Sequence, residues 1–318
     1  MDGRLDLRSV AGANPGAGSG FKRAGIVLGV AGVMAVMVTL VANIVTGNLV
    51  NDPHGAITVG KGSAWAFGLT ITGFGALKIG IALILMGILV TLWERIGAIK
   101  TALPSLMGVG DAGTPVAPGE FESPYGRATV AQDEPDELLI HRMARTLWLP
   151  MLAMGAMALL AGFVVSLVWS DRVAGDPLQA AHLSAVAQGL QFAGEGFLLS
   201  GVSFLLGTIL GSLRKGGAEV QKHLGVPINT LRMPVSAKLF VGLMVAGLMV
   251  EIGQLIAYFA VATFDNPVSI ASYFAWLGPV REFGLGLLLS GIVLALATIA
   301  KALGFQFHRL SEVVVHGS

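Results

Sequence analysis

The chain contains no cysteine among its 318 residues, and only 12% of its residues are charged. The lack of cysteine excludes disulfides, thiolate zinc sites, cysteine-ligated iron–sulfur clusters and cysteine nucleophiles. A formal net charge of +1 leaves no large basic surface, so we expect no nucleic-acid partner. Apolar residues make up 54% of the chain and the mean hydropathy is +0.76, which is not the composition of a soluble protein. The sequence predicts an integral membrane protein whose main partner is the lipid bilayer.

Several apolar runs are long enough to cross a membrane. A helix needs about 20 residues to span the hydrocarbon layer. Six runs meet this length, and they lie near residues 24–47, 66–93, 147–170, 186–213, 239–264 and 277–302. The fold class that we predict is therefore an all-α integral membrane protein with six transmembrane helices.

Lys and Arg are distributed unequally between the segments that connect these runs. On one side the connecting segments contain only Lys61 and Arg172, whereas the other side holds the remaining basic residues outside the runs. Basic residues are enriched in cytoplasmic loops, so both termini are predicted to be cytoplasmic. The Ala-, Gly- and Val-rich composition favours the plasma (inner) membrane of a bacterium over an organelle.

The connecting segments suggest a division of the chain into hairpins. Residues 94–135 contain five prolines among Gly, Ser and acidic residues, which is typical of a flexible cytoplasmic linker without a fold of its own. The predicted organisation is a cytoplasmic N-terminal tail (1–23), helical hairpin 1 (24–93), this linker (94–135), helical hairpin 2 (136–213), a cytoplasmic loop (214–238), helical hairpin 3 (239–302) and a cytoplasmic C-terminal tail (303–318).

An internal repeat is suggested when the chain is shifted against itself by about 90 residues. Pro177 then aligns with Pro267, and the run GEGFLLSG from Gly194 aligns with GLGLLLSG from Gly284. A more diverged third copy includes GIALILMG from Gly80. Units of two helices keep their orientation, so these copies would be parallel repeats. Chance similarity between apolar helices is the competing explanation.

Five charged residues fall inside the predicted spans, where a central charge costs roughly 2.5–3.5 kcal/mol. They are Lys78, Glu195, Glu251, Arg281 and Glu282. Helical spacing places Gln188, Gln191 and Glu195 on one face, and it places Glu251 and Gln254 on another. We predict a polar layer that faces the interior of the bundle and contains Lys78, Gln188, Gln191, Glu195, Glu251, Gln254, Arg281 and Glu282.

Three interpretations of this layer stay open. In the first, Lys78 and Arg281 neutralise the acids and fix the register of the helices, which leaves one acid that is protonated or hydrated. In the second, the layer is a solute or proton site in which a carboxylate changes its protonation state. In the third, one charge faces a partner subunit.

Other motifs give little support to an enzyme. We expect all six histidines to lie in loops or extensions, and no two have the spacing of metal ligands: His54, His141, His182, His223, His308 and His316. We therefore predict no catalytic residue, no cofactor and no metal. Small residues at four-residue spacing, such as Gly25–Gly29, Gly196–Ser200 and Gly207–Gly211, indicate close helix packing, with homo-oligomerisation as an alternative.

Two functional hypotheses follow from these features. The first is translocation of a small solute or ion through the polar layer. The second is a non-catalytic accessory or anchoring subunit of a larger membrane complex, which would bind other membrane subunits.

Overall fold

The computed structural model describes residues 17–47, 55–106, 119–131, 137–223 and 227–316. The described chain forms six long helices, which are α2 (Ala17–Gly47), α3 (Gly55–Leu106), α4 (Leu139–Arg172), α5 (Pro177–His223), α6 (Val235–Val261) and α7 (Pro267–His316). Each is long and apolar enough to cross a membrane, as the sequence predicted. The protein is therefore an all-α, multi-pass membrane protein.

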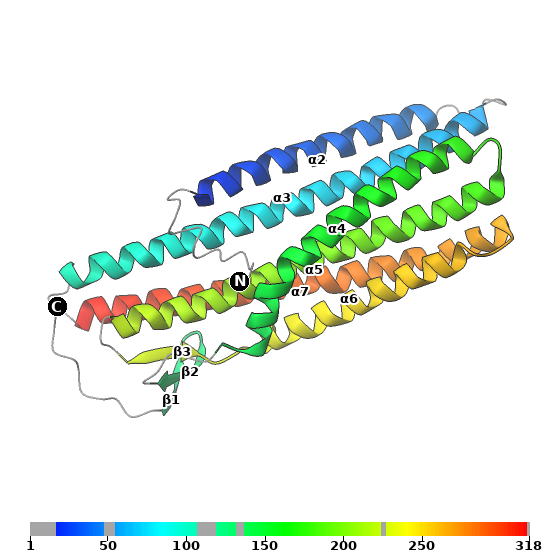
Figure 1. Ribbon diagram of the computed structural model, residues 1–318. Coiled ribbons are helices and arrows are strands. Elements are labelled where there is room, and N and C mark those ends of the chain that lie inside the picture. The colour runs from blue at the N-terminus through cyan, green and yellow to red at the C-terminus, as the bar shows by residue number, and fades with distance from the viewer. Residues whose placement is uncertain (1–16, 48–54, 107–118, 132–136, 224–226, 317–318) are drawn as a thin grey trace, which may run out of the picture.

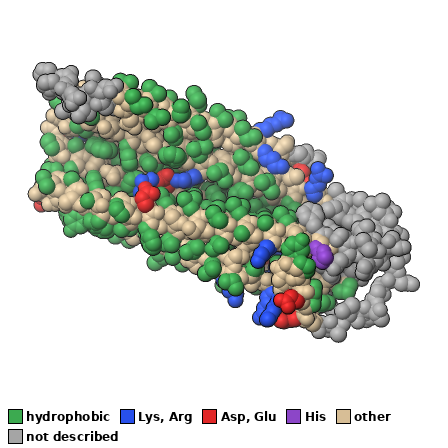
Figure 2. Space-filling model, turned by 180° about the vertical axis from the view of Figure 1, so that it is seen from behind, with side chains coloured by type: hydrophobic (Ala, Val, Ile, Leu, Met, Phe, Trp, Pro, Cys, Tyr) green, Lys and Arg blue, Asp and Glu red, His purple; other side chains and the backbone are tan. Residues whose placement is uncertain are grey.

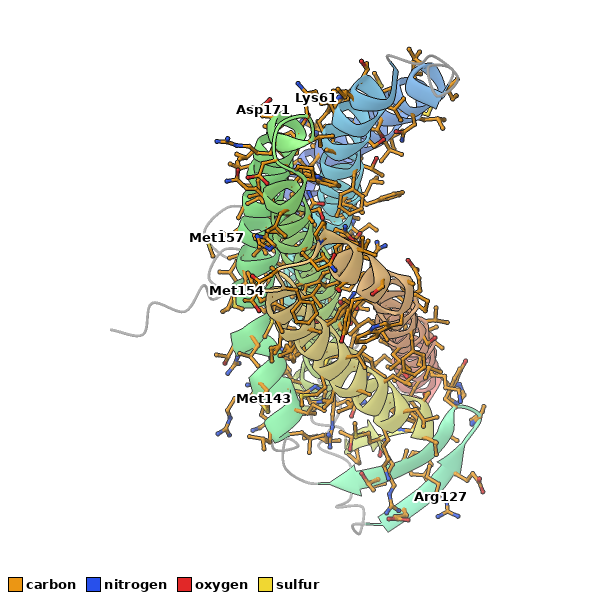
Figure 3. The ribbon with its side chains drawn as sticks, turned by 90° about the vertical axis from the view of Figure 1, so that its right-hand side faces the viewer. Lys61, Arg127, Met143, Met154, Met157 and Asp171 are labelled. Atoms are coloured by element: carbon orange, nitrogen blue, oxygen red, sulfur yellow. The ribbon has the colours of Figure 1, made fainter. Side chains whose placement is uncertain are left out.

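Helix α5 lies at the centre of the bundle (Figure 1). It packs against α3, α4, α6 and α7, and its residues from Gln191 to Ile209 are almost all buried. Helices that follow one another in the chain also pack in pairs, α2 with α3, α4 with α5, and α6 with α7. The outer helices instead expose large apolar side chains, among them Met154 and Met157 on α4, which point away from the bundle (Figure 3). Such faces suit contact with lipid.

The internal repeat stays a prediction.

Glycines at seven-residue spacing hold α2 against α3. A Cβ atom at Gly25 would lie 2.6 Å from the carbonyl oxygen of Gly80, and one at Gly32 would lie 2.6 Å from that of Gly73. The Oγ1 atom of Thr70 donates a hydrogen bond of 2.9 Å to Thr39 further along the same contact. Residues seven positions apart lie on nearly the same face of a helix, so these glycines recur along the contact between α2 and α3. The two backbones therefore stay close over several turns.

Helix α4 bends within its first third, so that its first turns run across the bundle before the helix joins α5 (Figure 1). Pro150 lies inside the helix after these turns. A proline removes one backbone hydrogen bond and its ring collides with the carbonyl group four residues earlier, here that of Thr146. The bend places residues 138–144 over the middle of α5, where they form one wall of a cavity described below.

Helices α3, α5 and α7 are longer than a bilayer is thick. They contain 52, 47 and 50 residues, which correspond to lengths of about 70–78 Å, against about 40–45 Å for a bilayer with its headgroups. Their ends beyond the spans pack together, because a Cβ atom at Gly216 would meet Ile96 and one at Gly217 would meet Gln306. The predicted loop 214–238 and tail 303–318 are therefore helical over much of their length.

The expectation that residues 94–135 lack a fold is wrong for the described part of that segment. Helix α3 continues to Leu106, and strands β1 (Gly119–Ser123) and β2 (Gly126–Ala131) form a hairpin. Strand β3 (Ile228–Leu231) adds to β2, giving an antiparallel sheet in the order β1-β2-β3, in which Thr129 pairs with Thr230. The partner strand lies about a hundred residues away in the sequence, so the local composition of the segment did not reveal the sheet.

Candidate functional site

The polar layer is centred on Glu195 of α5. Its Oε2 atom accepts a 2.7 Å hydrogen bond from Nη2 of Arg281 on α7, and its Oε1 atom accepts one from Nζ of Lys78 on α3. The Glu195 side chain is only 3% exposed, whereas Lys78 and Arg281 are partly accessible from the outside. The ion pairs join α3, α5 and α7.

Arg281 has two further contacts within the layer. Its guanidinium carbon lies 4.0 Å from the ring centroid of Phe192 on α5, a cation–π arrangement. Its Nη1 atom donates a 3.1 Å hydrogen bond to Glu282, whose side chain is 70% exposed. The prediction that Glu282 faces the bundle interior is therefore wrong, since consecutive helix positions point about 100° apart and Arg281 takes the inward direction. Figure 2 shows basic and acidic side chains halfway along an otherwise apolar face.

Glu251 of α6 is the acid without a basic partner. The residue is 1% exposed, and neither carboxyl oxygen has a hydrogen-bond partner in the described part of the chain. Its side chain occupies a slot between α5 and α7. A Cβ atom added at Gly196 of α5 would lie 2.5 Å from the Cγ atom of Glu251, and one added at Gly284 of α7 would lie 2.6 Å from its Oε1 atom. Two glycines thus make room for a carboxyl group that receives no donor from them.

The charges of the layer balance if Glu251 is neutral. Lys78 and Arg281 supply two positive charges, and Glu195 and Glu282 supply two negative ones. An ionised carboxylate without hydrogen-bond donors in an apolar surrounding is strongly disfavoured, so the neutral acid has the lower free energy. Lys78 and Arg281 thus join α3 and α7 to Glu195, as in the first interpretation, and Glu251 is the acid left over.

The three glutamines extend the polar layer along α5 and α6. Gln191 donates 3.3 Å and 3.4 Å hydrogen bonds to the Gly68 carbonyl oxygen and to Oγ of Ser166. Gln254 donates one of 3.3 Å to the carbonyl oxygen of Leu277, and Gln188 accepts one of 3.5 Å from Tyr258. Gln191 and Gln254 are buried, as predicted, and their Oε1 atoms have no hydrogen-bond partner among the described residues. Each buried amide thus keeps a free acceptor atom.

Four of the small residues singled out in the sequence lie against neighbouring helices. Gly196 admits Glu251, and Gly207 and Gly211 bring α5 within contact of Ala144 and His141 on α4. Gly25 lies against α3, as described above.

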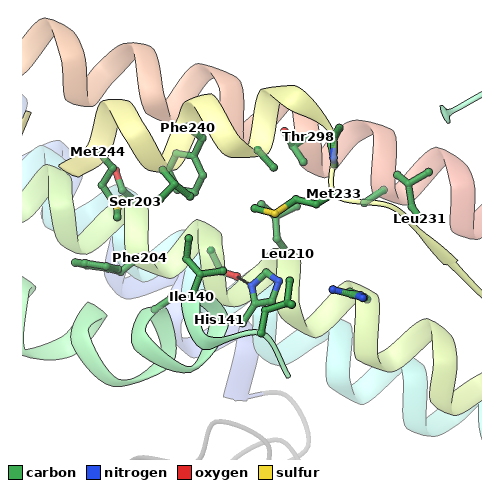
Figure 4. A pocket seen from close by; sticks show the side chains of 18 of the residues that line it. Ile140, His141, Ser203, Phe204, Leu210, Leu231, Met233, Phe240, Met244 and Thr298 are labelled. Atoms are coloured by element: carbon green, nitrogen blue, oxygen red, sulfur yellow. Dashed lines mark hydrogen bonds between the residues drawn. The ribbon is translucent and has the colours of Figure 1, made fainter. Parts of the chain in front are cut away.

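A cavity beside the middle of α5 was not predicted from the sequence. It has a volume of about 90 Å³ and lies among α4, α5, α6, α7 and the segment that follows β3 (Figure 4). Its lining is largely apolar and includes Phe204, Phe240 and Met244, with His141 and Arg214 among its few polar side chains. Two features of the sequence could have indicated this cavity. They are Pro150, which bends α4, and the glycines of α5 that leave space for the first turns of α4.

Two of the six histidines lie in helical extensions that precede the predicted spans 147–170 and 186–213. His141 lies in α4, where its Nδ1 atom is 3.2 Å from the Gly207 carbonyl oxygen, and His182 lies in α5, where its Nε2 atom is 2.7 Å from the carbonyl oxygen of Phe264. Both bind backbone groups of neighbouring segments and so help to fix the packing. In the described ranges, no cluster of three or more His, Asp or Glu side chains has the geometry of a metal site.

Comparison with known proteins yields no relative. No protein-family model, no curated protein and no solved structure matches the chain. The function of this protein is therefore inferred from the geometry of its own residues.

Proposed function

We propose that the protein translocates a small solute or ion through the polar layer, with Glu251 as the group that takes up and releases a proton. The observation that carries the proposal is the position of Glu251, which is buried in a glycine slot with no hydrogen-bond donor, beside an ion-paired cluster that joins three helices. Intramembrane ionisable groups commonly mark ion and proton pathways.

The link between protonation and motion has a physical basis in this slot. The slot tolerates a neutral carboxyl group, whereas an ionised one would seek donors that the slot does not offer. The basic residues near it are Lys78 and Arg281, which already share Glu195. Loss of the proton from Glu251 would therefore favour a rearrangement of α6 and α7 relative to α5, and such rocking of helix pairs is a way to alternate access.

We further propose that the protein resides in a bacterial plasma membrane with the first turn of α2 and the last turns of α7 on the cytoplasmic side. Both of these ends lie at the same end of the bundle (Figure 1), as an even number of spans requires. Lys61 and Arg127 lie at opposite ends (Figure 3), and the end that holds Arg127 also carries most of the basic residues.

The test is proton flux in reconstituted vesicles loaded with a pH-sensitive dye. With membrane potential clamped by potassium and valinomycin, an imposed pH gradient is expected to collapse faster in vesicles with the wild-type protein than in empty vesicles. Glu251→Gln is expected to return the rate to that of empty vesicles, because glutamine keeps the shape but cannot release a proton. Glu122→Gln, on the exposed β1 strand, is the control and is expected to retain the wild-type rate. Equal rates for Glu251→Gln and the wild type would contradict the proposal.

A second candidate, an accessory or anchoring subunit, is favoured by Glu282. A side chain that is 70% exposed within a membrane span would be costly against lipid, but a basic residue of a neighbouring subunit could cover it. Gentle extraction followed by mass measurement distinguishes the two functions. The accessory role is supported if the wild-type particle contains other membrane proteins and the Glu282→Gln variant no longer binds them. A particle that contains this chain alone contradicts the accessory role.

A further inference from the structure

The cavity between α4 and α6 differs from the polar layer in both its lining and its position. Its walls come from the bent start of α4, from α6 and from α7, and its floor is the middle of α5 (Figure 4). The lining is dominated by Phe, Leu, Met and Ala side chains, so water gains few hydrogen bonds there. A water-sized group needs about 10–15 Å³ of such a cavity, so 90 Å³ accommodates a run of roughly six to nine methylene-sized groups.

The polar end of the cavity carries an arginine. Arg214 of α5 lines the cavity, and its buried Nε atom has no hydrogen-bond partner among the residues that the structure describes. No ion pair joins Arg214 to any acid in the described residues, and the nearby Glu137 is bound to Arg145 at 3.3 Å. A half-buried guanidinium that lacks a carboxylate offers several free donors, and the fork of a guanidinium matches the oxygens of a phosphate group.

The length of the cavity fits one leaflet of a bilayer. Phe204 and Arg214 line the cavity from the same helix ten positions apart, which corresponds to about 15 Å along the helix axis. That distance is half of the hydrocarbon thickness of about 30 Å. Arg214 directly follows the predicted span 186–213, where headgroups begin, while Phe204 lies toward the bilayer centre.

We propose that this cavity binds an anionic phospholipid, with one acyl chain between α4 and α6 and the phosphate group on Arg214. The exposed residues Arg142, Lys238 and Lys301 belong to the same end of the bundle, where Figure 2 shows most of the basic side chains, and they would attract an anionic headgroup. A free phosphate ion would satisfy Arg214 but would leave the apolar part of the cavity empty. The charge and the apolar lining together therefore select a lipid.

Lipid binding to the purified full-length protein tests the proposal. After delipidation in detergent, the protein is titrated with dioleoyl-phosphatidylglycerol or dioleoyl-phosphatidylcholine, and bound lipids are counted by native mass spectrometry. The wild type is expected to bind one phosphatidylglycerol at least about tenfold more tightly than phosphatidylcholine, because the choline cation of phosphatidylcholine offsets the negative charge of its phosphate beside Arg214. Arg214→Gln is expected to reduce this ratio to about one.

Matched variants separate the site from general charge attraction. Lys215→Gln removes the same charge at the neighbouring exposed position and is expected to keep the preference. Ala302→Phe places a bulky side chain in the cavity and is expected to weaken binding of both lipids, provided that the variant elutes and melts like the wild type. Inorganic phosphate at equal concentration is expected not to displace phosphatidylglycerol.

Three results would overturn the proposal. They are equal affinity of the wild type for the two lipids, a preference that survives Arg214→Gln, and displacement of the lipid by phosphate alone, which would indicate an anion site without an acyl chain. None of these results depends on whether the protein translocates an ion.

Discussion

The carboxyl group of Glu251 fills the space beside Gly196 that a side chain at that position would need. A Cβ atom on Gly196 would lie 2.5 Å from the Cγ atom of Glu251, well inside van der Waals contact. The glycine on α5 therefore leaves the space that the acid on α6 fills, and a larger residue at position 196 would require a shift of the helix pair or of the Glu251 side chain.

Gly196→Ala is expected to destabilise the bundle by about 1–3 kcal/mol, because the new methyl group must displace the Glu251 side chain or move α6 away from α5. Thermal unfolding of the purified protein in detergent measures the effect. Gly253→Ala on α6 is the control, since a Cβ atom there meets nothing within 4 Å and is expected to cause no loss of stability. Equal melting temperatures for the two variants would show that the slot is not tightly packed.

Glu251→Gln is expected to leave the free energy of unfolding nearly unchanged, because glutamine has the shape of the neutral acid that the slot favours. The wild type is expected to show the infrared absorption of a protonated carboxyl group at neutral pH, and the variant is expected to lack it. A Glu122→Gln control removes an exposed carboxylate and is expected to leave this band unchanged. A wild-type spectrum that contains only ionised carboxylates would contradict a neutral Glu251.

Glu195→Gln is expected to be more damaging than Lys78→Ala, because Glu195 has two basic partners and Lys78 has one acidic partner in the cluster. Removing the acid takes away the acidic partner of Lys78 and leaves Arg281 with only the exposed Glu282, at a cost of about 3–5 kcal/mol. Lys78→Ala leaves Glu195 bound to Arg281, so the loss is expected to be about 1.5–3 kcal/mol. Denaturant unfolding of the two variants in the same detergent gives the order, and a larger loss for Lys78→Ala would show that Arg281 does not support Glu195.

Gly25→Ala is expected to separate α2 from α3, because the added methyl group would meet the backbone oxygen of Gly80, which cannot rotate away. The absence of native cysteines makes a disulfide between Thr39→Cys and Thr70→Cys a specific reporter, since these side chains are hydrogen-bonded in the wild type. We expect the cross-linking yield to fall with Gly25→Ala and to stay high with Gly29→Ala, where a Cβ atom meets nothing within 4 Å. A yield unaffected by Gly25→Ala would contradict the glycine seam.

The six helices and the cross-helix ion pairs could be predicted from the sequence because both depend on strong local signals. Apolar runs of sufficient length have few alternatives to spanning a membrane, and a charge such as Lys78 within a span requires a partner. Helical spacing then placed Gln191, Glu195 and Glu251 on inward faces, where the structure has them.

The outward direction of Glu282 and the described structure within residues 94–135 could not be predicted in the same way. Arg281 and Glu282 are adjacent, so only packing against Phe192 decides which of them faces α5. The sheet depends on pairing between strands about a hundred residues apart, which no local pattern records. The cavity beside Arg214 arises from the bend at Pro150, whose direction is set by tertiary contacts.

The orientation of the bundle can be tested with single cysteines in this cysteine-free chain. Lys61 and Lys215 belong to opposite ends of the helices, and Lys215 lies on the side that carries most of the basic residues. If that side is cytoplasmic, a membrane-impermeant maleimide is expected to label Lys61→Cys in intact cells and to label Lys215→Cys only after the cells are permeabilised. Both positions lie outside the predicted spans 66–93 and 186–213. Labelling in permeabilised cells is therefore the control for the accessibility of each thiol. Labelling of Lys215→Cys but not Lys61→Cys in intact cells would reverse the assignment, and it would place the lipid cavity in the outer leaflet.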